Sequence, residues 1–191
     1  MFRKRTDEFG NPIGGSKFLD SLIEWLLSIV FAVLLFFLLR NFVFRVAQVE
    51  GSSMEPTLVH GDMVLLNRFN YIFSSPQVGD IIAFPPYEND PTRYYIKRIV
   101  AKPGDVIDLV GYSFYINGEP MDDDFSYEPL RSFGDLEFPF EVKEGQFFVL
   151  GDNRNGSMDS RFSSVGTVSS DVMVGKVSVR IWPRGRIGQV D

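Results

Sequence analysis

Two adjacent serines lie in the stretch VEGSSMEPTL, residues 49–58, shortly after a long apolar segment. A serine hydroxyl is a weak nucleophile until a neighbouring base takes its proton, and histidine is the usual base. The chain has a single histidine, His60, in the stretch VHGDM, which is typical of a polar turn before a strand. A surface turn is the simpler explanation of His60, so a base for Ser52 or Ser53 must be sought elsewhere.

Lysine can replace histidine as the base when burial keeps its amine neutral. If the stretch RYYIKRIV is an extended strand, Tyr95, Lys97 and Ile99 share one face, and apolar groups flank the amine. The same pattern also fits an edge strand from which Lys97 reaches water. The pattern alone does not decide between these two environments.

A third segment whose residues could take part in chemistry is LGDNRNGSMDSR, residues 150–161. Turn-forming and charged residues there directly follow the apolar run FFVL. Loops at strand ends often carry function, although a well hydrogen-bonded turn is the simpler explanation. Four charged residues of this segment could pair with one another: Asp152, Arg154, Asp159 and Arg161. Ser157 could exchange a hydrogen bond with a neighbour.

Composition excludes several classes of function. The absence of cysteine removes thiol nucleophiles, disulfides and thiolate metal sites, and one histidine cannot build a zinc site with several imidazole ligands. Metal chemistry would need carboxylates alone, and no such cluster stands out in the sequence, so we expect no metal. The net charge is −6, and the 14 basic and 21 acidic residues after position 40 give that part a charge of −7. This sign argues against a nucleic-acid partner.

Residues 22–39 form an apolar run whose single charge is Glu24. Eighteen residues at helical rise just span roughly 30 Å of hydrocarbon. A buried helix is seldom apolar on every face, and the apolar part of a cleavable signal peptide is shorter, about 7–15 residues. The run therefore predicts a retained transmembrane helix in contact with the lipid bilayer.

Basic residues are more numerous before this helix than just after it: Arg3, Lys4, Arg5 and Lys17 precede it, and Arg40 and Arg45 follow. This bias predicts a cytoplasmic N-terminus. Residues 1–21 would then be a cytoplasmic segment, and residues 40–191 an extracytoplasmic domain of a single-pass protein in the cytoplasmic membrane.

Beyond residue 40 the pattern changes to short β-rich runs separated by Gly, Pro, Asn and Asp. The runs are residues 44–50, 63–69, 80–85, 93–101, 105–110, 113–118, 145–152 and 174–182. Short strands at close spacing predict a mainly β domain, an antiparallel barrel or sandwich. Residues 120–141, rich in proline and acidic side chains, are expected to be a loop or insertion.

Four stretches together carry a family resemblance. GSSMEPTL, VGDIIAF, YYIKRIVAKPGD and VLGDNRNGSMDSR are similar, in order, to the signature segments of bacterial type I signal peptidases. The resemblance covers roughly residues 18–183 and includes the N-terminal anchor. It implies a membrane-bound serine endopeptidase with an antiparallel β fold, which cleaves N-terminal signal peptides from exported preproteins by a Ser-Lys dyad. The protein export machinery is a possible further partner, and no cofactor is implied.

The resemblance assigns the nucleophile to Ser53, directly before Met, and the general base to Lys97, and it gives His60 no role. It implies that Ser157 hydrogen-bonds and orients the lysine amine. The other matched polar residues surround the site: Asp159 and Arg161 as a bracing pair, and Asp152 and Arg98 as further support.

The resemblance also implies an oxyanion site at the backbone N–H of Ser53. Some members add a hydroxyl donor two positions before the nucleophile, where this chain has Gly51. The residues matched to shallow apolar substrate pockets are Val49, Met54, Leu58, Tyr95 and Ile96. Pockets formed by such large residues would favour a small–x–small motif before the cleaved bond, such as Ala-x-Ala.

Two rival functions remain to be compared with this one. Self-cleaving repressors also use a Ser-Lys pair, but they need a DNA-binding helical domain where this chain has an apolar segment. A catalytically inactive exported β domain that acts as a binding or assembly factor is the alternative from another class. Peptide cleavage by the purified protein discriminates it from a peptidase.

Overall fold

The computed structural model describes residue 9 and residues 17–42, 44–68, 71, 74–86, 94–121 and 129–190. The chain divides into two compact units, Met1–Asn41 and Phe42–Asp191. Three of the basic residues behind the predicted orientation, at positions 3–5, lie outside the described residues.

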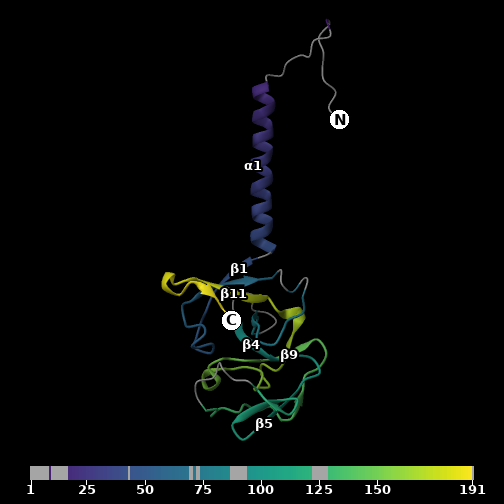
Figure 1. Ribbon diagram of the computed structural model, residues 1–191, viewed down its shortest axis with the longest axis vertical. Helices are drawn as coiled ribbons and strands as arrows, with labels where there is room; N and C mark the ends of the chain where they lie inside the picture. The colour runs from purple at the N-terminus through teal and green to yellow at the C-terminus, as the bar shows by residue number, and fades with distance from the viewer. Residues whose placement is uncertain are drawn as a thin grey trace. The chain divides into compact units, whose positions relative to one another are not determined.

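The first unit contains the helix α1, Lys17–Phe42, whose 26 residues extend the predicted 22–39 segment at both ends (Figure 1). Its stretch Leu19–Phe37 is long and apolar enough to cross a membrane, and none of it is buried. Leu, Ile, Val and Phe occupy every side of this stretch, so the helix has no polar face to turn toward water.

The second unit is built from two antiparallel sheets. The larger sheet has the strand order β1-β2-β11-β3-β4-β9-β10, and β12 pairs with β11. Its strands are β1 Phe44–Gln48, β2 Met63–Asn67, β3 Ile81–Phe84, β4 Tyr95–Ala101, β9 Gln146–Leu150, β10 Val168–Ser169, β11 Gly175–Trp182 and β12 Gly188–Gln189.

The smaller sheet has the order β7-β6-β5-β8, and Figure 1 shows β5 at the far end of the body from β1 and β11. Its strands are β5 Val106–Val110, β6 Ser113–Ile116, β7 Glu119–Pro120 and β8 Phe140–Glu141. The described residues of the unit also form the short 3-10 helices η1 Arg154–Gly156, η2 Ser170–Val172 and η3 Arg184–Arg186. The predicted mainly β, antiparallel fold is confirmed. All eight predicted strands are present, and the four that were missed have only two residues each.

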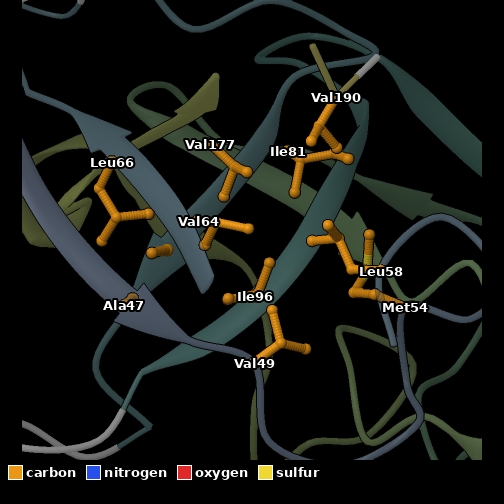
Figure 2. Packing of buried hydrophobic residues seen from close by; sticks show 11 residues of the cluster. Ala47, Val49, Met54, Leu58, Val64, Leu66, Ile81, Ile96, Val177 and Val190 are labelled. Carbon is orange, nitrogen blue, oxygen red and sulfur yellow. The ribbon is translucent and has the colours of Figure 1, made fainter. Parts of the chain in front are cut away.

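Strand β4 lies inside the larger sheet, paired with β3 on one side and β9 on the other. Its side chains alternate between core clusters: Ile96 packs with β2 and β11 residues, whereas Ile99 packs in a second cluster with Tyr95. Figure 2 shows Ile96 among the first cluster, close to Val49. Both faces of β4 are thus buried, as expected for an internal strand.

The predicted insertion at 120–141 is mostly irregular, although Pro120 ends β7 and Phe140–Glu141 form β8. Residues 122–128 lie outside the described residues. The part from 129 onward packs on the fourth signature segment, VLGDNRNGSMDSR. The Arg161 carbonyl accepts N–H bonds from Asp135 at 3.1 Å and Leu136 at 3.0 Å. A Cβ on Gly134 would lie 2.1 Å from the same carbonyl oxygen, so only glycine fits there.

Candidate active site

The structure brings Ser53 and Lys97 together from positions 44 residues apart. Lys97 Nζ donates to Ser53 Oγ at 2.7 Å and to the carbonyl oxygen of Ile96 at 3.1 Å. The amine also lies 5.2 Å from the centre of the Tyr95 ring. These contacts place a potential base within proton-transfer distance of the serine hydroxyl.

Lys97 is 3% exposed, so the edge-strand alternative, in which its amine reaches water, is wrong. Burial lowers the pKa of Lys97 from 10.5 to about 8, because a charged amine is poorly solvated there. Asp159 and Asp152 raise this pKa again by smaller amounts, and Arg161 lowers it. With a pKa near 8, roughly a tenth of the molecules hold a neutral amine at pH 7.

The carboxylates near Lys97 are each engaged by an arginine. Asp159 accepts from Arg161 Nε at 2.7 Å, and both side chains are fully buried. Asp152 accepts from Arg98 Nε and from its second terminal nitrogen, each at 2.9 Å. Such two-point pairing compensates the buried charges and limits how strongly the carboxylates stabilise the ammonium form of the lysine.

The hydrogen bond expected between Ser157 and the lysine amine is not present. Ser157 Oγ is buried and has no hydrogen-bond partner among the described residues. It lies instead against Gly151, where a Cβ would be 2.3 Å from it. The amine already uses two of its donors on Ser53 and Ile96, so the orienting bond expected from Ser157 is supplied by a backbone carbonyl.

Side chains that the sequence analysis did not single out hold the Ser53 loop. Thr57 Oγ1 donates to Asp152 Oδ2 at 2.6 Å, which ties the loop to the buried Arg98 pair. Asn153 Nδ2 donates to the Ser52 carbonyl at 3.1 Å. The sequence pattern did not predict these contacts, because the bonded residues lie about a hundred positions apart in the chain.

His60 also has a structural role that was not expected. It is exposed in a turn, as predicted, but its Nδ1 accepts the N–H of Gly51 at 3.2 Å. Gly51 has a φ of 84° with no atom near its missing Cβ, so the backbone conformation explains the glycine here. Neither residue hydrogen-bonds Ser53 or Lys97 in the structure. The single histidine instead stabilises the turn through its bond to Gly51.

A pocket of about 310 Å³ opens beside the dyad. Its lining residues come from three segments: Val49, Glu50, Gly51, Ser52, Ser53 and Met54; Tyr94, Tyr95, Ile96 and Lys97; and Gly156 and Met158. Four of the five expected pocket residues are among them. Leu58 is not, because the Leu58 N–H to Met54 carbonyl bond turns the chain helically and directs Leu58 into the core (Figure 2).

Within the described ranges, no three His, Asp or Glu side chains are grouped so that they could hold a metal ion. The polar groups at the pocket include the Ser53 hydroxyl, the Lys97 amine of lowered pKa and backbone amides. This set of groups can perform nucleophilic acyl transfer.

Comparison with known proteins decides the family. The family model described as signal peptidase, peptidase S26, matches residues 22–182. The chain belongs to the type I signal peptidases. It is 33% identical to signal peptidase IB of Staphylococcus aureus over 177 residues, 85% of this chain and 90% of the relative.

A further curated relative agrees in name. Signal peptidase I of Leptolyngbya laminosa is 34% identical over 176 residues, 88% of this chain and 84% of the relative. A crystal structure of a signal peptidase I from Enterococcus faecalis V583 is 31% identical, with a TM-score of 0.45 over 55% of this chain and 98% of that one. As a type I signal peptidase, the protein is a serine endopeptidase, and the family supports cleavage of signal peptides.

Proposed function

We propose that this signal peptidase cleaves preproteins with Ser53 as nucleophile and Lys97 as general base. The observation that carries the proposal is the 2.7 Å contact between the Lys97 amine and the Ser53 hydroxyl, in a setting that lowers the amine pKa to about 8. A neutral amine at this distance can take the hydroxyl proton as the oxygen attacks.

Four proton and bond changes complete the reaction. Ser53 Oγ bonds to the scissile carbonyl carbon while its proton moves to Lys97 Nζ, and the carbonyl oxygen becomes an oxyanion. The ammonium then gives its proton to the leaving amine as the peptide C–N bond breaks, which leaves an ester on Ser53. Lys97 next deprotonates a water, which attacks the ester carbonyl. As the ester C–O bond breaks and releases the signal peptide with a free carboxyl group, the Lys97 ammonium returns its proton to Ser53 Oγ. The oxyanion accepts a hydrogen bond from the Ser53 N–H.

The apolar pocket supports the small–x–small preference. Val49, Met54, Tyr95 and Ile96 line it, and Val49 and Met54 are also part of the core, so their positions are fixed. Walls of this size leave room for a methyl group and exclude larger side chains by steric overlap. The expected substrates are therefore the signal peptides of exported preproteins with Ala-x-Ala before the cleaved bond.

We further propose that α1 anchors the enzyme in the cytoplasmic membrane, with residues 1–21 cytoplasmic, residues 22–39 spanning the bilayer and the domain 40–191 on the outer side. The apolar stretch Leu19–Phe37 and the excess of basic residues before it support this topology. Protease added to spheroplasts should digest the catalytic domain, and complete protection of residues 50–191 would refute the orientation.

The catalytic assignment is tested by incubating a preprotein with wild-type enzyme and with Ser53→Ala, Lys97→Ala and Ser52→Ala, and by sequencing the product N-terminus. Ser53→Ala and Lys97→Ala should abolish cleavage, whereas the matched change Ser52→Ala should leave most of it. Equal loss at both serines, or full activity of Lys97→Ala, would contradict the dyad. Replacing the Ala before the bond by Leu or Phe should nearly abolish cleavage.

A further inference from the structure

Asn153 holds the Ser53 loop through hydrogen bonds to two consecutive carbonyl groups. Its side-chain Nδ2 donates to the carbonyl oxygen of Ser52 at 3.1 Å. Its backbone N–H donates to the carbonyl oxygen of Ser53 at 3.0 Å. These two bonds fix the peptide units on either side of the Ser53 Cα, although Asn153 itself lies outside hydrogen-bond contact with the dyad side chains.

The first of these bonds sets the direction of one particular N–H group. The Ser52 carbonyl and the Ser53 N–H belong to the same planar trans peptide and point in opposite directions. The carbonyl is held from one side by Asn153 Nδ2 and by the N–H of Glu55 at 3.1 Å, so the Ser53 N–H must point away from both. Within the described part of the chain, the structure gives this N–H no hydrogen-bond acceptor.

Asn153 is itself held firmly. Its Oδ1 accepts the N–H of Gly156 at 3.1 Å, which leaves the amide nitrogen as the end that faces Ser52. The preceding Gly151 donates its N–H to Asp159 at 3.0 Å and accepts from Arg154 Nε at 3.0 Å. The fully buried Asp159 thereby fixes the base of the loop that carries Asn153.

The two loops also approach too closely for a side chain at the contact. A Cβ on Gly151 would lie 2.4 Å from the Ser53 carbonyl oxygen, a distance that real Cβ atoms do not show. The Asn153 amide therefore reaches a carbonyl held at a set position, which favours one orientation of the Ser52–Ser53 peptide. Gly51 adds to the importance of this orientation, because its position offers no hydroxyl donor to the oxyanion.

We propose that Asn153 is the positioning residue of the oxyanion site: through the Ser52 carbonyl it aims the Ser53 N–H at the oxygen of the tetrahedral intermediate. This inference rests on the proposed function, in which Ser53 is the nucleophile. Asn153 acts through a peptide group and does not contact substrate. Its loss should therefore weaken transition-state stabilisation and leave both substrate binding and the base unchanged.

The test compares Asn153→Asp with Asn155→Asp in the full-length enzyme in detergent. The first change retains the acceptor for Gly156 but loses the donor to Ser52. The second makes the same change in charge two residues away, where the amide of Asn155 contacts the carbonyl of Pro129 at 3.0 Å and the N–H of Arg131 at 2.7 Å. Asn155 thus provides a matched control in the same turn, directed at another segment.

The substrates are an Ala-x-Ala peptide ester and the same ester with sulfur in place of its carbonyl oxygen. Sulfur accepts hydrogen bonds poorly, so the ratio of the two kcat values reports on the oxyanion donor. In Asn153→Asp, we expect kcat for the oxygen ester to fall about 10- to 100-fold, with KM unchanged. The oxygen-to-sulfur ratio should fall about tenfold, whereas Asn155→Asp should retain the wild-type ratio.

An unchanged ratio in Asn153→Asp, with an active wild-type enzyme, would overturn the role of Asn153 and leave the proposed function intact. Failure of the wild type to hydrolyse either ester would overturn the proposed function and this inference with it. If Asn153→Asp does not unfold cooperatively, Asn153→Ser replaces it, because serine can accept the Gly156 N–H but is too short to reach Ser52. The oxygen-to-sulfur ratio of kcat should fall to the same extent in Asn153→Ser.

Discussion

The proposed general base and the proposed nucleophile are positioned in contrasting ways. Lys97 lies in the middle of β4, a seven-residue strand with a partner strand on each side and core clusters on both faces. Ser53 lies in a loop outside any ladder, where side chains of Thr57 and Asn153 supply the cross-links. Apolar packing thus fixes Lys97, whereas polar contacts from a distant loop fix Ser53.

This difference predicts different consequences of mutation. Changes around Lys97 should alter the free energy of unfolding, because they change what is buried. Changes around the Ser53 loop should alter kcat more than stability, because they mainly change orientation. Asp152 belongs to both regions, since it accepts from Arg98 of β4 and from Thr57 of the serine loop.

The largest effect is expected for Asp152→Ala, which breaks the link between the two regions. It leaves the guanidinium of Arg98, 2% exposed, without its ion pair, a cost of roughly 3–5 kcal/mol. Denaturant unfolding should show this loss, and preprotein cleavage should fall with it. The control is Asp171→Ala, on an exposed residue. If the denaturant midpoint of unfolding were the same for Asp152→Ala and wild type, Asp152 would not connect the β4 region to the Ser53 loop as we expect.

Replacing Lys97 by Met should stabilise the protein while it abolishes activity. The folded-state pKa of about 8 lies below the unfolded value of 10.5, so the folded protein binds fewer protons between these values. The cost of the buried lysine is therefore fully present below pH 8 and disappears as pH rises through 10.5.

We expect Lys97→Met to gain up to about 3 kcal/mol in free energy of unfolding at pH 7, and progressively less toward pH 10. Chemical unfolding at several pH values measures this difference. Lys176→Met is the contrasting control, because that partly exposed lysine pairs with Asp80 and its removal should lower stability. A destabilised Lys97→Met at pH 7 would contradict burial as the cause of the lowered pKa.

The smallest of these effects is expected for Thr57→Val, which keeps the side-chain shape but removes the hydroxyl bonded to Asp152. The loss of one hydrogen bond to a charged group is on the order of 1.5–3 kcal/mol. We expect most of it to appear as a kcat reduction of about tenfold at nearly constant KM. Thr57→Ser should restore activity, and an equal loss in both variants would assign the effect to packing.

The same contrast explains how much the sequence could predict. Strand β4 and the other longer strands have local patterns of apolar residues and turn formers, so their positions were predicted correctly. The two-residue strands β7, β8, β10 and β12 have no such pattern, because they form through pairing with a neighbouring strand. Ser53 and Lys97 were proposed as the catalytic pair through their signature segments, and the structure brings them into contact.

The supporting contacts could not be predicted in the same way. Thr57 and Asn153 bond to partners about a hundred residues distant, and a short polar residue in a turn carries no sign of its partner. Leu58 was placed at the pocket through the family resemblance, but a helical turn directs it into the core. Tertiary geometry, which sequence spacing does not contain, decides each of these cases.

The central claim is that a neutral, buried lysine activates Ser53, and the pH dependence of kcat/KM for the wild-type enzyme tests it most directly. Because the neutral amine is the active form, kcat/KM should rise about tenfold per pH unit below the Lys97 pKa and level off above about pH 8. The profile of His60→Ala should have the same midpoint. A flat profile between pH 5 and 9, or a midpoint near 6.5 that disappears in His60→Ala, would contradict the account.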